Sequence, residues 1–356
     1  MKRMKQFSYR PQPALRVYIP KDGSDQKRPL GIPSYEDKLV GGEMADILGA
    51  IYEPKFYEFS YGFRENRDAH QALEALDKKL WNWTNWVVDA DIKSFFDTVD
   101  HEWMMKFLEH DIEDKNYLRY IRRLLKAGIM EGGQRYETER GVPQGGLISA
   151  TLSNVYLHYV VDMWFAKVAA KRSAGRAEMV RYADDVVFCF ERESDAKRFY
   201  EALRERLGKF KLQLSEEKSK IIKFGRNAPN DAGKFDFLGF THITAKSRNG
   251  TFCVKRKTSL KKLKAKRKIV KLWLRENMHS PIKLLIDNLN RKLRGHYNYY
   301  GIIGNYDSLN AFRNYVLDRL KASLSRRGAN RVFSHKLFWN LLSAYPVILP
   351  KITHRI

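Results

Sequence analysis

The stretch "EMVRYADDVVFCF", Glu178 to Phe190, places two adjacent aspartates, Asp184 and Asp185, between two apolar runs. Carboxylates beside buried strands are costly unless they are paired or hold a metal ion. On a flat strand, neighbouring side chains point to opposite faces, so these two could not share a ligand there. The pattern therefore predicts two short strands joined by a tight turn. From these residues alone, a plain hairpin tip and a metal site both remain open.

A second carboxylate site lies earlier in the chain. The apolar run "WVVDADI" (Trp86–Ile92) predicts a strand that carries Asp91 near its end. Magnesium prefers oxygen ligands and is usually held by a few carboxylates together with substrate phosphates. Two such ions can activate a 3′-hydroxyl and stabilise the leaving pyrophosphate, which requires carboxylates from two strands. Asp91 and the Asp184–Asp185 pair meet that requirement, while Asp89 and Asp97 are more typical of salt bridges or helix caps.

The surrounding segments predict a mixed front part of the chain. Turn residues in "KDGSDQ" predict a hairpin over residues 14–33. An apolar stripe predicts a helix over 66–80, which Asn66 or Asp68 can cap. The remaining predictions are a helix capped by Asp100, a helix over 147–171 that starts at Ser149 or a nearby hydroxyl, strands on both sides of the aspartate pair, a helix over 194–210, and strands over 234–244 and 251–256.

Charge divides the chain into two unequal parts. The net charge is +25, and residues 246–356 hold 26 Lys and Arg against 4 Asp and Glu, which leaves the first 245 residues nearly neutral. Helices are predicted over 255–275, 280–301 and 306–327. In the first of these, Leu260, Leu263, Val270, Trp273 and Leu274 share one face and lysines occupy the other. A folded basic segment of this size is typical of a protein that binds a phosphate backbone.

Several classes of protein are disfavoured by the composition. The first residues lack the apolar core of a secretory signal, and no apolar run is long enough for a membrane span. Two cysteines, Cys189 and Cys253, predict no disulfide framework and indicate a reducing cytoplasm. Neither zinc-ligand spacing nor a Walker-type phosphate loop is present in the sequence.

Three motifs together resemble those of reverse transcriptases encoded by group II introns. They are "YADD" at Tyr182–Asp185, "DIKSFFD" at Asp91–Asp97 and "GVPQGG" at Gly141–Gly146. Other stretches are similar in the family's order: "VYIPKDGSDQKRPLGIPSYEDKLV" and "FSYGFRENRDAHQALEAL" in the fingers, "GGLISATLSNVYL", "LQLSEEKSK" and "KFDFLGF" in the palm, and "LNRKLRGHYNYYGI" and "FRNYVLDRL" in the thumb or maturase region. The resemblance covers residues 10–350.

The resemblance implies a right-hand polymerase of the α+β class. Its fingers would span residues 1–86, its palm, with an antiparallel sheet and part of the fingers, 87–245, and its basic helical thumb or maturase-like domain 246–356. The implied reaction is RNA-directed DNA synthesis from a primer 3′-hydroxyl with dNTPs and two Mg²⁺ ions, for which Mn²⁺ could substitute. The implied catalytic carboxylates and metal ligands are Asp91, Asp184 and Asp185, joined by the backbone carbonyl of Ile92, and Asp184 is the firmer ligand.

The resemblance also implies contacts with nucleotide and primer. Lys21 and Arg28 would bind the triphosphate, Phe96 would lie under the sugar and Phe95 in the core, and Gln144 would touch the incoming nucleotide. Without the resemblance, these residues are equally natural as hairpin charges, packing residues and a loop side chain. The residues implied for the primer and template are Leu238, Gly239, Lys218, Lys261, Lys264, Lys268, Arg291 and Arg294. Of Tyr297, Tyr299 and Tyr300, at least one is expected in the core.

The implied partners are an RNA template, a DNA or RNA primer, and an intron or other structured RNA, with no membrane, in a bacterial cytoplasm. Two alternatives remain: an intron-splicing maturase with secondary polymerase activity, and a domesticated reverse transcriptase in phage defence. An RNA-copying RNA polymerase fits less well because Phe96 would hinder ribonucleotides. The chain departs from the family in "SATLSN", where "SPLLAN" is usual, and we expect most of the family's N-terminal extension and its nuclease module to be missing.

Overall fold

The computed structural model describes residues 2–20, 27–142, 145–226, 228, 233–247, 249–327 and 334–356. These residues form two compact units. The first unit holds the described residues up to Gly233 together with 246–252, and the second holds 234–245 with the described residues from 253 onward. The predicted division into fingers, palm and thumb stays a prediction, and each unit is described below by itself.

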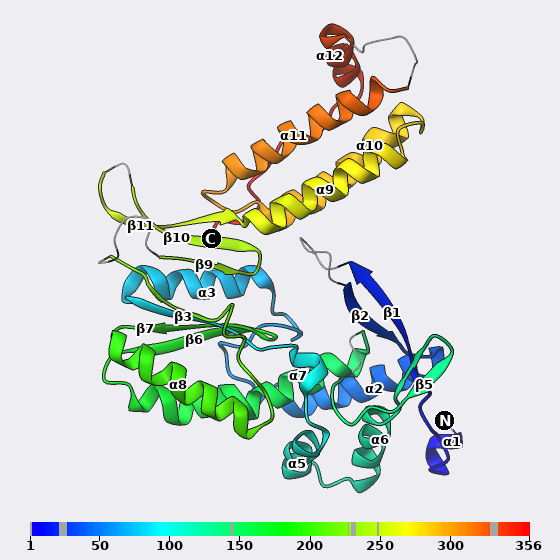
Figure 1. Ribbon diagram of the computed structural model, residues 1–356, viewed down its shortest axis with the longest axis vertical. Coiled ribbons are helices and arrows are strands. Elements are labelled where there is room, and N and C mark those ends of the chain that lie inside the picture. Colours follow the sequence, from blue (N-terminus) through cyan, green and yellow to red (C-terminus); the bar gives the residue numbers. More distant parts are fainter. Residues whose placement is uncertain are drawn as a thin grey trace. The chain divides into compact units, whose positions relative to one another are not determined.

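A four-stranded antiparallel sheet forms the centre of the first unit (Figure 1). Its order is β6 (Ala177–Tyr182), β7 (Asp185–Phe190), β3 (Trp86–Asp91) and β8 (Lys220–Lys223). The strands predicted on both sides of the aspartate pair and the strand carrying Asp91 are therefore confirmed, and they are direct neighbours. The two strands beside the turn pair along their whole length, from Ala177 opposite Phe190 to Tyr182 opposite Asp185.

Helices cover both faces of this sheet, which explains why its strands are apolar almost throughout. Val88 and Phe188 lie in the main core, where Phe199 and Leu203 of α8 (Glu193–Lys209) also pack. On the opposite face, α3 (Ala69–Asn82) contributes buried Leu73, Leu76 and Leu80, and Val87 and Cys189 are fully buried there as well. The ribbon of Figure 1 shows α3 and α8 on opposite sides of the strands.

The predicted N-terminal hairpin is confirmed. Strands β1 (Ala14–Pro20) and β2 (Lys27–Ile32) are antiparallel, and β1 also pairs in parallel with β4 (Ile129–Glu131). β4 continues into β5 (Gln134–Tyr136), so the sheet order is β2-β1-β4-β5. Helix α2 (Tyr35–Tyr52) follows the hairpin and packs against α7 (Leu147–Leu157).

Side-chain caps set several helix starts of the first unit. Asp68 begins α3 in a capping box with Gln71, which decides between the two predicted caps. Asp100 caps α5 (His101–Asp111) as predicted. The short helices are α1 (Lys2–Lys5) and α4 (Phe95–Thr98), and Asp114 caps α6 (Lys115–Leu125).

The prediction for the helix over 147–171 was wrong in two respects. Helix α7 begins after Gly146 without a side-chain cap, and Ser149 is buried inside its first turn. Beyond Leu157 the helix widens into π-helical turns η1 (His158–Asp162) and η2 (Phe165–Ala169) and closes with the 3₁₀ turn η3 (Ala170–Arg172). Such π-turns are frequent at functional sites, and a hydrophobic periodicity does not reveal them.

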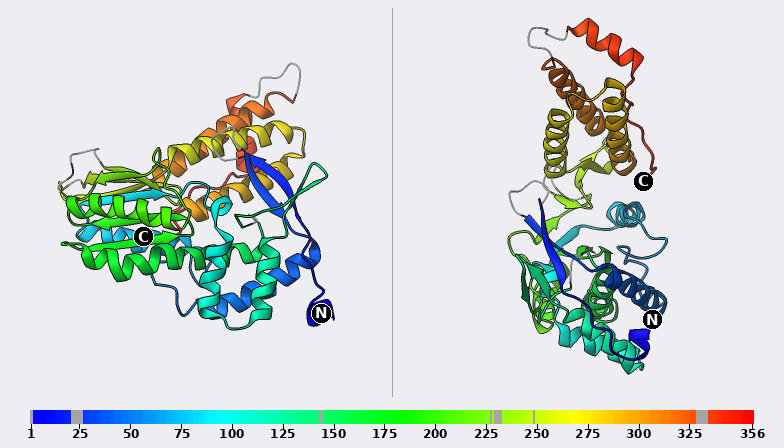
Figure 2. Two further views of the ribbon diagram at one scale, coloured as in Figure 1. Left: turned by 60° about the horizontal axis from the view of Figure 1, so that its bottom comes forward. Right: turned by 90° about the vertical axis from the view of Figure 1, so that its right-hand side faces the viewer.

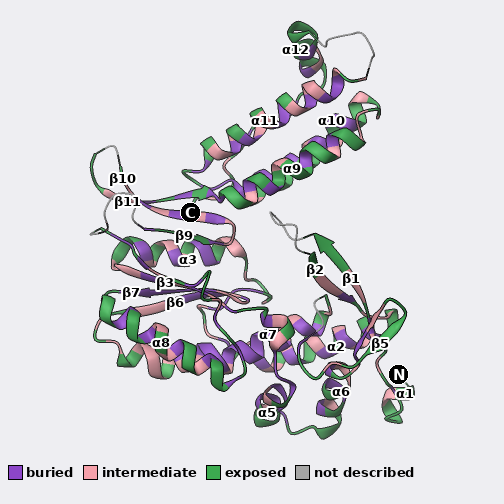
Figure 3. Cartoon of the chain, viewed as in Figure 1, coloured by how far each residue is buried: buried purple, intermediate pink, exposed green. Residues whose placement is uncertain are grey.

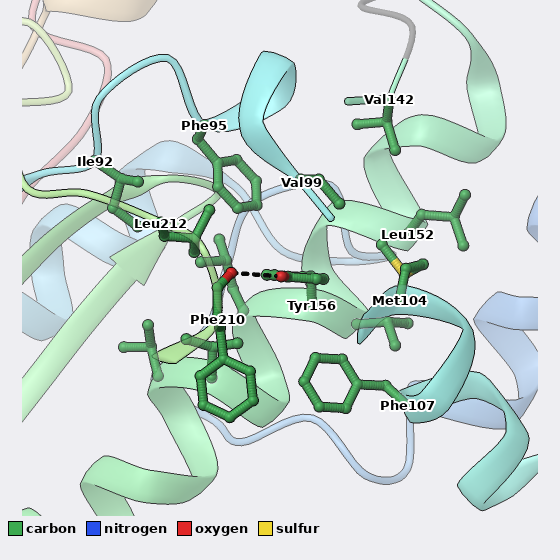
Figure 4. Packing of buried hydrophobic residues seen from close by; sticks show 14 of the residues in the cluster. Ile92, Phe95, Val99, Met104, Phe107, Val142, Leu152, Tyr156, Phe210 and Leu212 are labelled. Atoms are coloured by element: carbon green, nitrogen blue, oxygen red, sulfur yellow. Dashed lines mark hydrogen bonds between the residues drawn. The ribbon is translucent and has the colours of Figure 1, made fainter. Parts of the chain in front are cut away.

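A core of aromatic and aliphatic side chains lies next to the strand that carries Asp91 (Figure 4). Ile92 and Phe95 pack near Leu212, and Phe107 lies edge-on to Tyr156 with ring centroids 5.4 Å apart. The Tyr156 hydroxyl donates to the carbonyl of Phe210 at 2.8 Å, so the one polar group of that side chain is satisfied. This packing fixes the end of β3 and the segment after it.

The second unit combines a small sheet with a helical bundle. The sheet order is β11 (Phe252–Thr258), β10 (Phe240–Lys246) and β9 (Lys234–Phe237), which confirms strands over 234–244 and 251–256. Its helices are α9 (Leu260–Glu276), α10 (Ile282–Tyr300), α11 (Tyr306–Leu324) and α12 (His335–Ala344), and the first three lie side by side in both views of Figure 2.

Burial confirms most of the predicted helix faces of the second unit (Figure 3). Tyr297 and Tyr300 are buried, as expected for at least one of the three tyrosines. Leu260 was wrongly placed on the buried face of α9: it is the first residue of that helix and 72% exposed, because the packed stripe begins a turn later at Leu263. Among the described helices, none is both long and apolar enough to cross a membrane.

Candidate active site

The turn between β6 and β7 carries the aspartate pair. Tyr182 pairs with Asp185, so Ala183 and Asp184 are the two residues of the turn itself. Ala183 has a φ of +56°, a left-handed conformation that a residue with a Cβ adopts at a cost. This confirms the tight turn predicted from the sequence and separates the two aspartates: Asp184 lies in the turn, and Asp185 begins the strand.

The register of the sheet brings the other predicted carboxylate to this turn. Asp91 is directly opposite Asp185 on β3 and β7. Cross-strand partners project from the same face of an antiparallel pair, with Cβ atoms about 5 Å apart. Burial, followed by the negative charge of Asp91, raises the pKa of Asp184, and the cations of Arg28 and Arg181 act against that rise. Asp91 and Asp184 are therefore close enough to interact electrostatically.

Asp91 has polar neighbours that hold it in place. The Lys218 ammonium lies 2.8 Å from its Oδ2 atom, and the Ser219 hydroxyl accepts from its backbone N–H at 3.1 Å. The Asp91 side chain is nevertheless 43% exposed and that of Lys218 57% exposed, so a ligand from solvent can reach the carboxylate. Lys218 was predicted to contact primer or template, and the structure brings it to a carboxylate.

The carbonyl of Ile92 points away from the neighbouring segment that contains Leu214. Lys93 donates to Gln213 and Ser215 donates to Asp91, so Ile92 and Leu214 face each other as a non-hydrogen-bonded pair. In such a pair the backbone groups of both residues point away from the partner strand. The Ile92 carbonyl thus points to the side on which β7 lies.

The donor set fits a hard divalent cation without forming a complete cage. Carboxylates and a backbone carbonyl are the oxygen ligands that magnesium prefers. Among the described residues, no group of three or more His, Cys, Asp or Glu side chains stands close enough to hold a metal ion by itself.

Residues predicted for the nucleotide are partly placed. Arg28, exposed on β2, is close enough to Asp184 to affect its pKa. Phe95 is buried and Phe96 is half-buried, with ring centroids 5.4 Å apart, which is the predicted division between core and surface. Lys21 and Gln144 lie outside the described residues.

The backbone on both sides of Gln144 is anchored near the site. Val142 donates its N–H to the carbonyl of Phe96 at 2.8 Å. Gly141 has a φ of +86°, and a Cβ there would stand 3.0 Å from that same carbonyl. A Cβ on Gly145 would stand 3.0 Å from the carbonyl of Gly31 on β2. Gly141 and Gly145 of "GVPQGG" are therefore required for close packing against Phe96 and the hairpin.

The predicted primer-grip residues lie in the second unit. Leu238 and Gly239 form the turn between β9 and β10, with φ angles of +50° and +79°. The Tyr299 hydroxyl donates to the Leu238 carbonyl, and the Ser259 N–H donates to that of Gly239, both at 2.9 Å. Both carbonyls of the turn are thus bonded within the unit.

The basic residues predicted to bind nucleic acid are on the surface of the second unit. Lys261, Lys264 and Lys268 are exposed on α9, and Arg291 and Arg294 are exposed on α10. Their helices bury Leu263, Leu274, Leu285 and Leu293 instead. The two helices therefore separate apolar and cationic faces as predicted.

Sequence reasoning missed Arg181, which directly precedes the "YADD" motif. It lies within the apolar strand β6, is 1% exposed, and donates to Asp162, Asn154 and the carbonyl of Ala183. A signal was present, because an arginine among the apolar residues of a central strand must have buried partners. Asp162 could not be recognised as its partner from sequence, since it lies in a π-helical turn.

Comparison with known proteins agrees with this geometry. Residues 19–242, more than half of the chain, match the family model described as "Reverse transcriptase (RNA-dependent DNA polymerase)". The chain belongs to the reverse transcriptase family. Residues 262–340 also match the model described as "Group II intron, maturase-specific domain". The family resemblance inferred from the motifs is confirmed.

Relatives of the chain include bacterial proteins. It is 34% identical over 278 residues to protein YkfC of Escherichia coli, covering 68% of this chain and 70% of that protein. It is 42% identical over 155 residues to the group II intron-encoded protein LtrA of Lactococcus lactis, covering 44% of this chain. That match spans only 26% of LtrA.

A solved structure supports the fold. Telomerase from Candida albicans, in complex with a fragment of telomeric RNA, aligns with 95% of this chain and 62% of its own, with a TM-score of 0.50. The sequences are only 14% identical, so the likeness concerns the fold alone. The reverse transcriptase fold with a helical C-terminal region is thereby confirmed.

Proposed function

We propose that this reverse transcriptase is an active RNA-directed DNA polymerase that extends the 3′-hydroxyl of a primer with dNTPs. The observation that carries the proposal is the strand register that sets Asp91 opposite Asp185 and beside the turn that holds Asp184. A maturase that had lost polymerisation would have no need for a strained turn and a half-buried, electrostatically coupled carboxylate.

Asp91, Asp184 and the Ile92 carbonyl would hold two Mg²⁺ ions, with Asp185 supporting them and Mn²⁺ able to substitute. When bound, the ions supply activation of the 3′-hydroxyl and stabilisation of the leaving pyrophosphate. The protein's own part is positioning: strands β3 and β7 set the spacing of the carboxylates, and the half-exposed Asp91 leaves an open side for primer and nucleotide.

Arg28 supports the proposal as a phosphate ligand. It is exposed on β2 and is close enough to Asp184 to act on it electrostatically, so a triphosphate between the two would meet a bidentate cation. We assign Lys21 to the same triphosphate and Gln144 to the incoming nucleotide on the family resemblance. Phe96 would exclude a 2′-hydroxyl, supported by its half-buried place beside Phe95.

The primer and template would contact basic and backbone groups. We assign the exposed cations of α9 and α10 to the phosphate backbone. Because both carbonyls of Leu238 and Gly239 are bonded within the protein, that turn would contact the primer by other groups. Lys218 would be released toward nucleic acid or pyrophosphate once a cation replaces it on Asp91.

Primer extension tests the proposal. The protein is incubated with a primed RNA template, Mg²⁺ and either dNTPs or NTPs, and extension is expected with dNTPs only. The Asp184→Asn/Asp185→Asn variant should lose extension by at least about a thousandfold, because electrostatic stabilisation dominates this chemistry. Asp97→Asn, a change at an exposed aspartate near the site, serves as the matched control. No dNTP incorporation on any template would contradict the proposal.

A second candidate function is assistance in intron splicing. The match of residues 262–340 to the maturase-specific domain favours it, and the basic surface suits structured RNA as well as a template duplex. Splicing of a group II intron RNA should then survive the Asp184→Asn/Asp185→Asn change. Loss of splicing together with polymerisation would contradict an independent maturase role.

We further propose a bacterial cytoplasm as the location of the protein. The relatives in Escherichia coli and Lactococcus lactis and the two free cysteines support this location.

A further inference from the structure

Arg181 and Asp162 form a fully buried ion pair in the first unit. Their side chains are 1% and 0% exposed. The guanidinium grips the carboxylate with two parallel bonds, from Nε to Oδ1 at 2.7 Å and from Nη2 to Oδ2. A bidentate pair of this kind fixes the plane of the guanidinium as well as its position.

The remaining nitrogen of Arg181 is directed at the aspartate turn. Nη1 donates to the carbonyl of Ala183 and to Oδ1 of Asn154, each at 3.0 Å. Asn154 in turn donates its amide to the carbonyl of Gly62 at 2.7 Å. The carbonyl that Arg181 holds belongs to the residue directly before Asp184, the residue with a φ of +56°.

The backbone around this turn is also tightly enclosed. Arg181 donates its N–H to Phe59, and Tyr61 donates to the Arg181 carbonyl, both at 2.8 Å. A Cβ on Gly62 would stand 2.3 Å from the N atom of Ala183, so only glycine allows this approach. The turn therefore cannot shift toward residues 59–62, and the hydrogen bond from Arg181 restrains the carbonyl of Ala183.

A plain stabilising role does not explain the choice of these residues. A buried ion pair is often no more stabilising than apolar side chains of similar volume, because both charges must be desolvated. A left-handed alanine persists only where its surroundings hold it. Lysine has the charge but no planar fork, so it cannot grip Asp162 and the turn carbonyl at once.

We propose that Arg181 is a positioning residue of the active site, which holds the Ala183 carbonyl and thereby sets where Asp184 stands relative to Asp91. Asp162 is its counter-ion, and Asn154 is the second anchor of its Nη1 atom. The inference rests on the proposed function, since it takes Asp184 and Asp91 as the metal-binding pair. It adds that affinity for the cation depends on side chains that never touch it.

Metal binding in the absence of nucleic acid tests this role. Mn²⁺ is titrated against the full-length protein and free Mn²⁺ is followed by electron paramagnetic resonance, with melting temperatures measured in EDTA. Arg181→Lys and the apolar double variant Arg181→Met/Asp162→Leu should weaken Mn²⁺ binding by about 10- to 100-fold, as loss of outer partners does at other metal sites. Arg206→Lys is the matched control, since Arg206 is a half-buried arginine that bonds the backbone carbonyls of Tyr159 and Val160 and not that of Ala183.

The outcomes separate the two proposals. If folded Arg181 variants bind Mn²⁺ as wild type does, or if Arg206→Lys weakens binding equally, the positioning role is wrong. Should the Arg181 variants fail to fold, Asn154→Ala keeps the ion pair, and it must still weaken Mn²⁺ binding. If wild type binds no Mn²⁺, the proposed function fails instead. In that case amide hydrogen exchange tests the positioning role of Arg181. The Arg181→Lys change must increase the exchange rate at residues 183–185 more than it does in α5, and an equal increase in both places would show that the role is wrong.

Discussion

At the scale of single residues, the structure distinguishes two aspartates that the sequence presents as equal. Asp184 lies in the turn, where Arg181 donates to the carbonyl of the preceding residue, Ala183, and where the negative charge of Asp91 acts on the Asp184 carboxyl. Asp185 instead occupies a regular strand position. The resemblance favoured Asp184 as the metal ligand, and burial, followed by the negative charge of Asp91, raises its pKa. Which of the two ligates the metal stays a prediction.

Replacing Asp184 should stabilise the metal-free protein at neutral pH. Burial and Asp91 raise the pKa of the folded carboxyl above its unfolded value, so the unfolded chain loses the proton first as pH rises. Stability is therefore lost as pH rises from the unfolded toward the folded pKa. Asp184→Asn removes this loss and should raise the unfolding free energy by about 0.5–2 kcal/mol at pH 7.5 in EDTA.

The comparison of two pH values checks that sign. Melting temperatures of wild type and Asp184→Asn in EDTA should converge as the pH falls below the ordinary pKa of an aspartyl group, where the carboxyl is protonated in both the folded and the unfolded chain. Asp97→Asn is the control, because Asp97 is exposed and far less desolvated. A variant that melts at or below wild type at pH 7.5 would show that ionised Asp184 is not a destabilising group.

At the scale of elements, two tight hairpin turns carry the residues assigned to chemistry and to the primer. The sequence predicted a tight turn at the aspartate pair because acidic residues interrupt an apolar run, and the structure places this turn at Ala183–Asp184. It predicted "KFDFLGF" only as a strand region, and the structure adds a turn at Leu238–Gly239 between β9 and β10. A lone glycine in a strand pattern indicates a bulge as readily as a turn. Hydrogen bonds from Tyr299 and Ser259, both distant in sequence, stabilise the turn at Leu238–Gly239.

Gly239→Ala should destabilise the second unit more than a similar change in open space. Gly239 has a φ of +79°, and a Cβ there would stand 2.9 Å from the hydroxyl of Tyr300, whose ring is buried. Gly304 has a φ of +84° with no atom within 4 Å of such a Cβ, so Gly304→Ala carries the backbone strain alone. We expect about 1–2 kcal/mol for Gly304→Ala and a larger loss for Gly239→Ala, measured by urea unfolding. Equal losses of unfolding free energy in the two variants would mean that the Tyr300 side chain moves aside at no energetic cost.

At the scale of the whole molecule, charge is the property that separates the two ends of the chain. The net charge of +25 resides almost entirely in residues 246–356. Several of those cations, among them Lys261, Lys264, Lys268, Arg291 and Arg294, are exposed on helices whose other faces are packed with leucine and valine, so their charge is available to a partner. A sequence can reveal this because helical periodicity alone decides which residues face outward.

Removing three lysines from α9 should weaken RNA binding in a salt-dependent manner. The triple change Lys261→Gln/Lys264→Gln/Lys268→Gln should reduce the slope of log affinity against log salt by about 2–3, because each phosphate contact releases roughly one counterion. The control removes equal charge from the first unit with Lys115→Gln, Lys126→Gln and Lys167→Gln, which are all exposed. Binding is measured by filter retention at several salt concentrations, and equal slopes for both triple variants would contradict the assignment of α9.

The sequence by itself determined what depends on local pattern. It predicted the N-terminal hairpin, the strands beside the aspartate pair, the strand of Asp91, the cap at Asp100, the basic face of α9, and the family to which the chain belongs. Tertiary structure alone decided what depends on distant partners. It set the register that pairs Asp91 with Asp185, the approach of Lys218 to Asp91, and the burial of Arg181 against Asp162 and Asn154. Register and buried ion pairs are fixed by packing between segments far apart in the chain, and no periodicity within one segment records them.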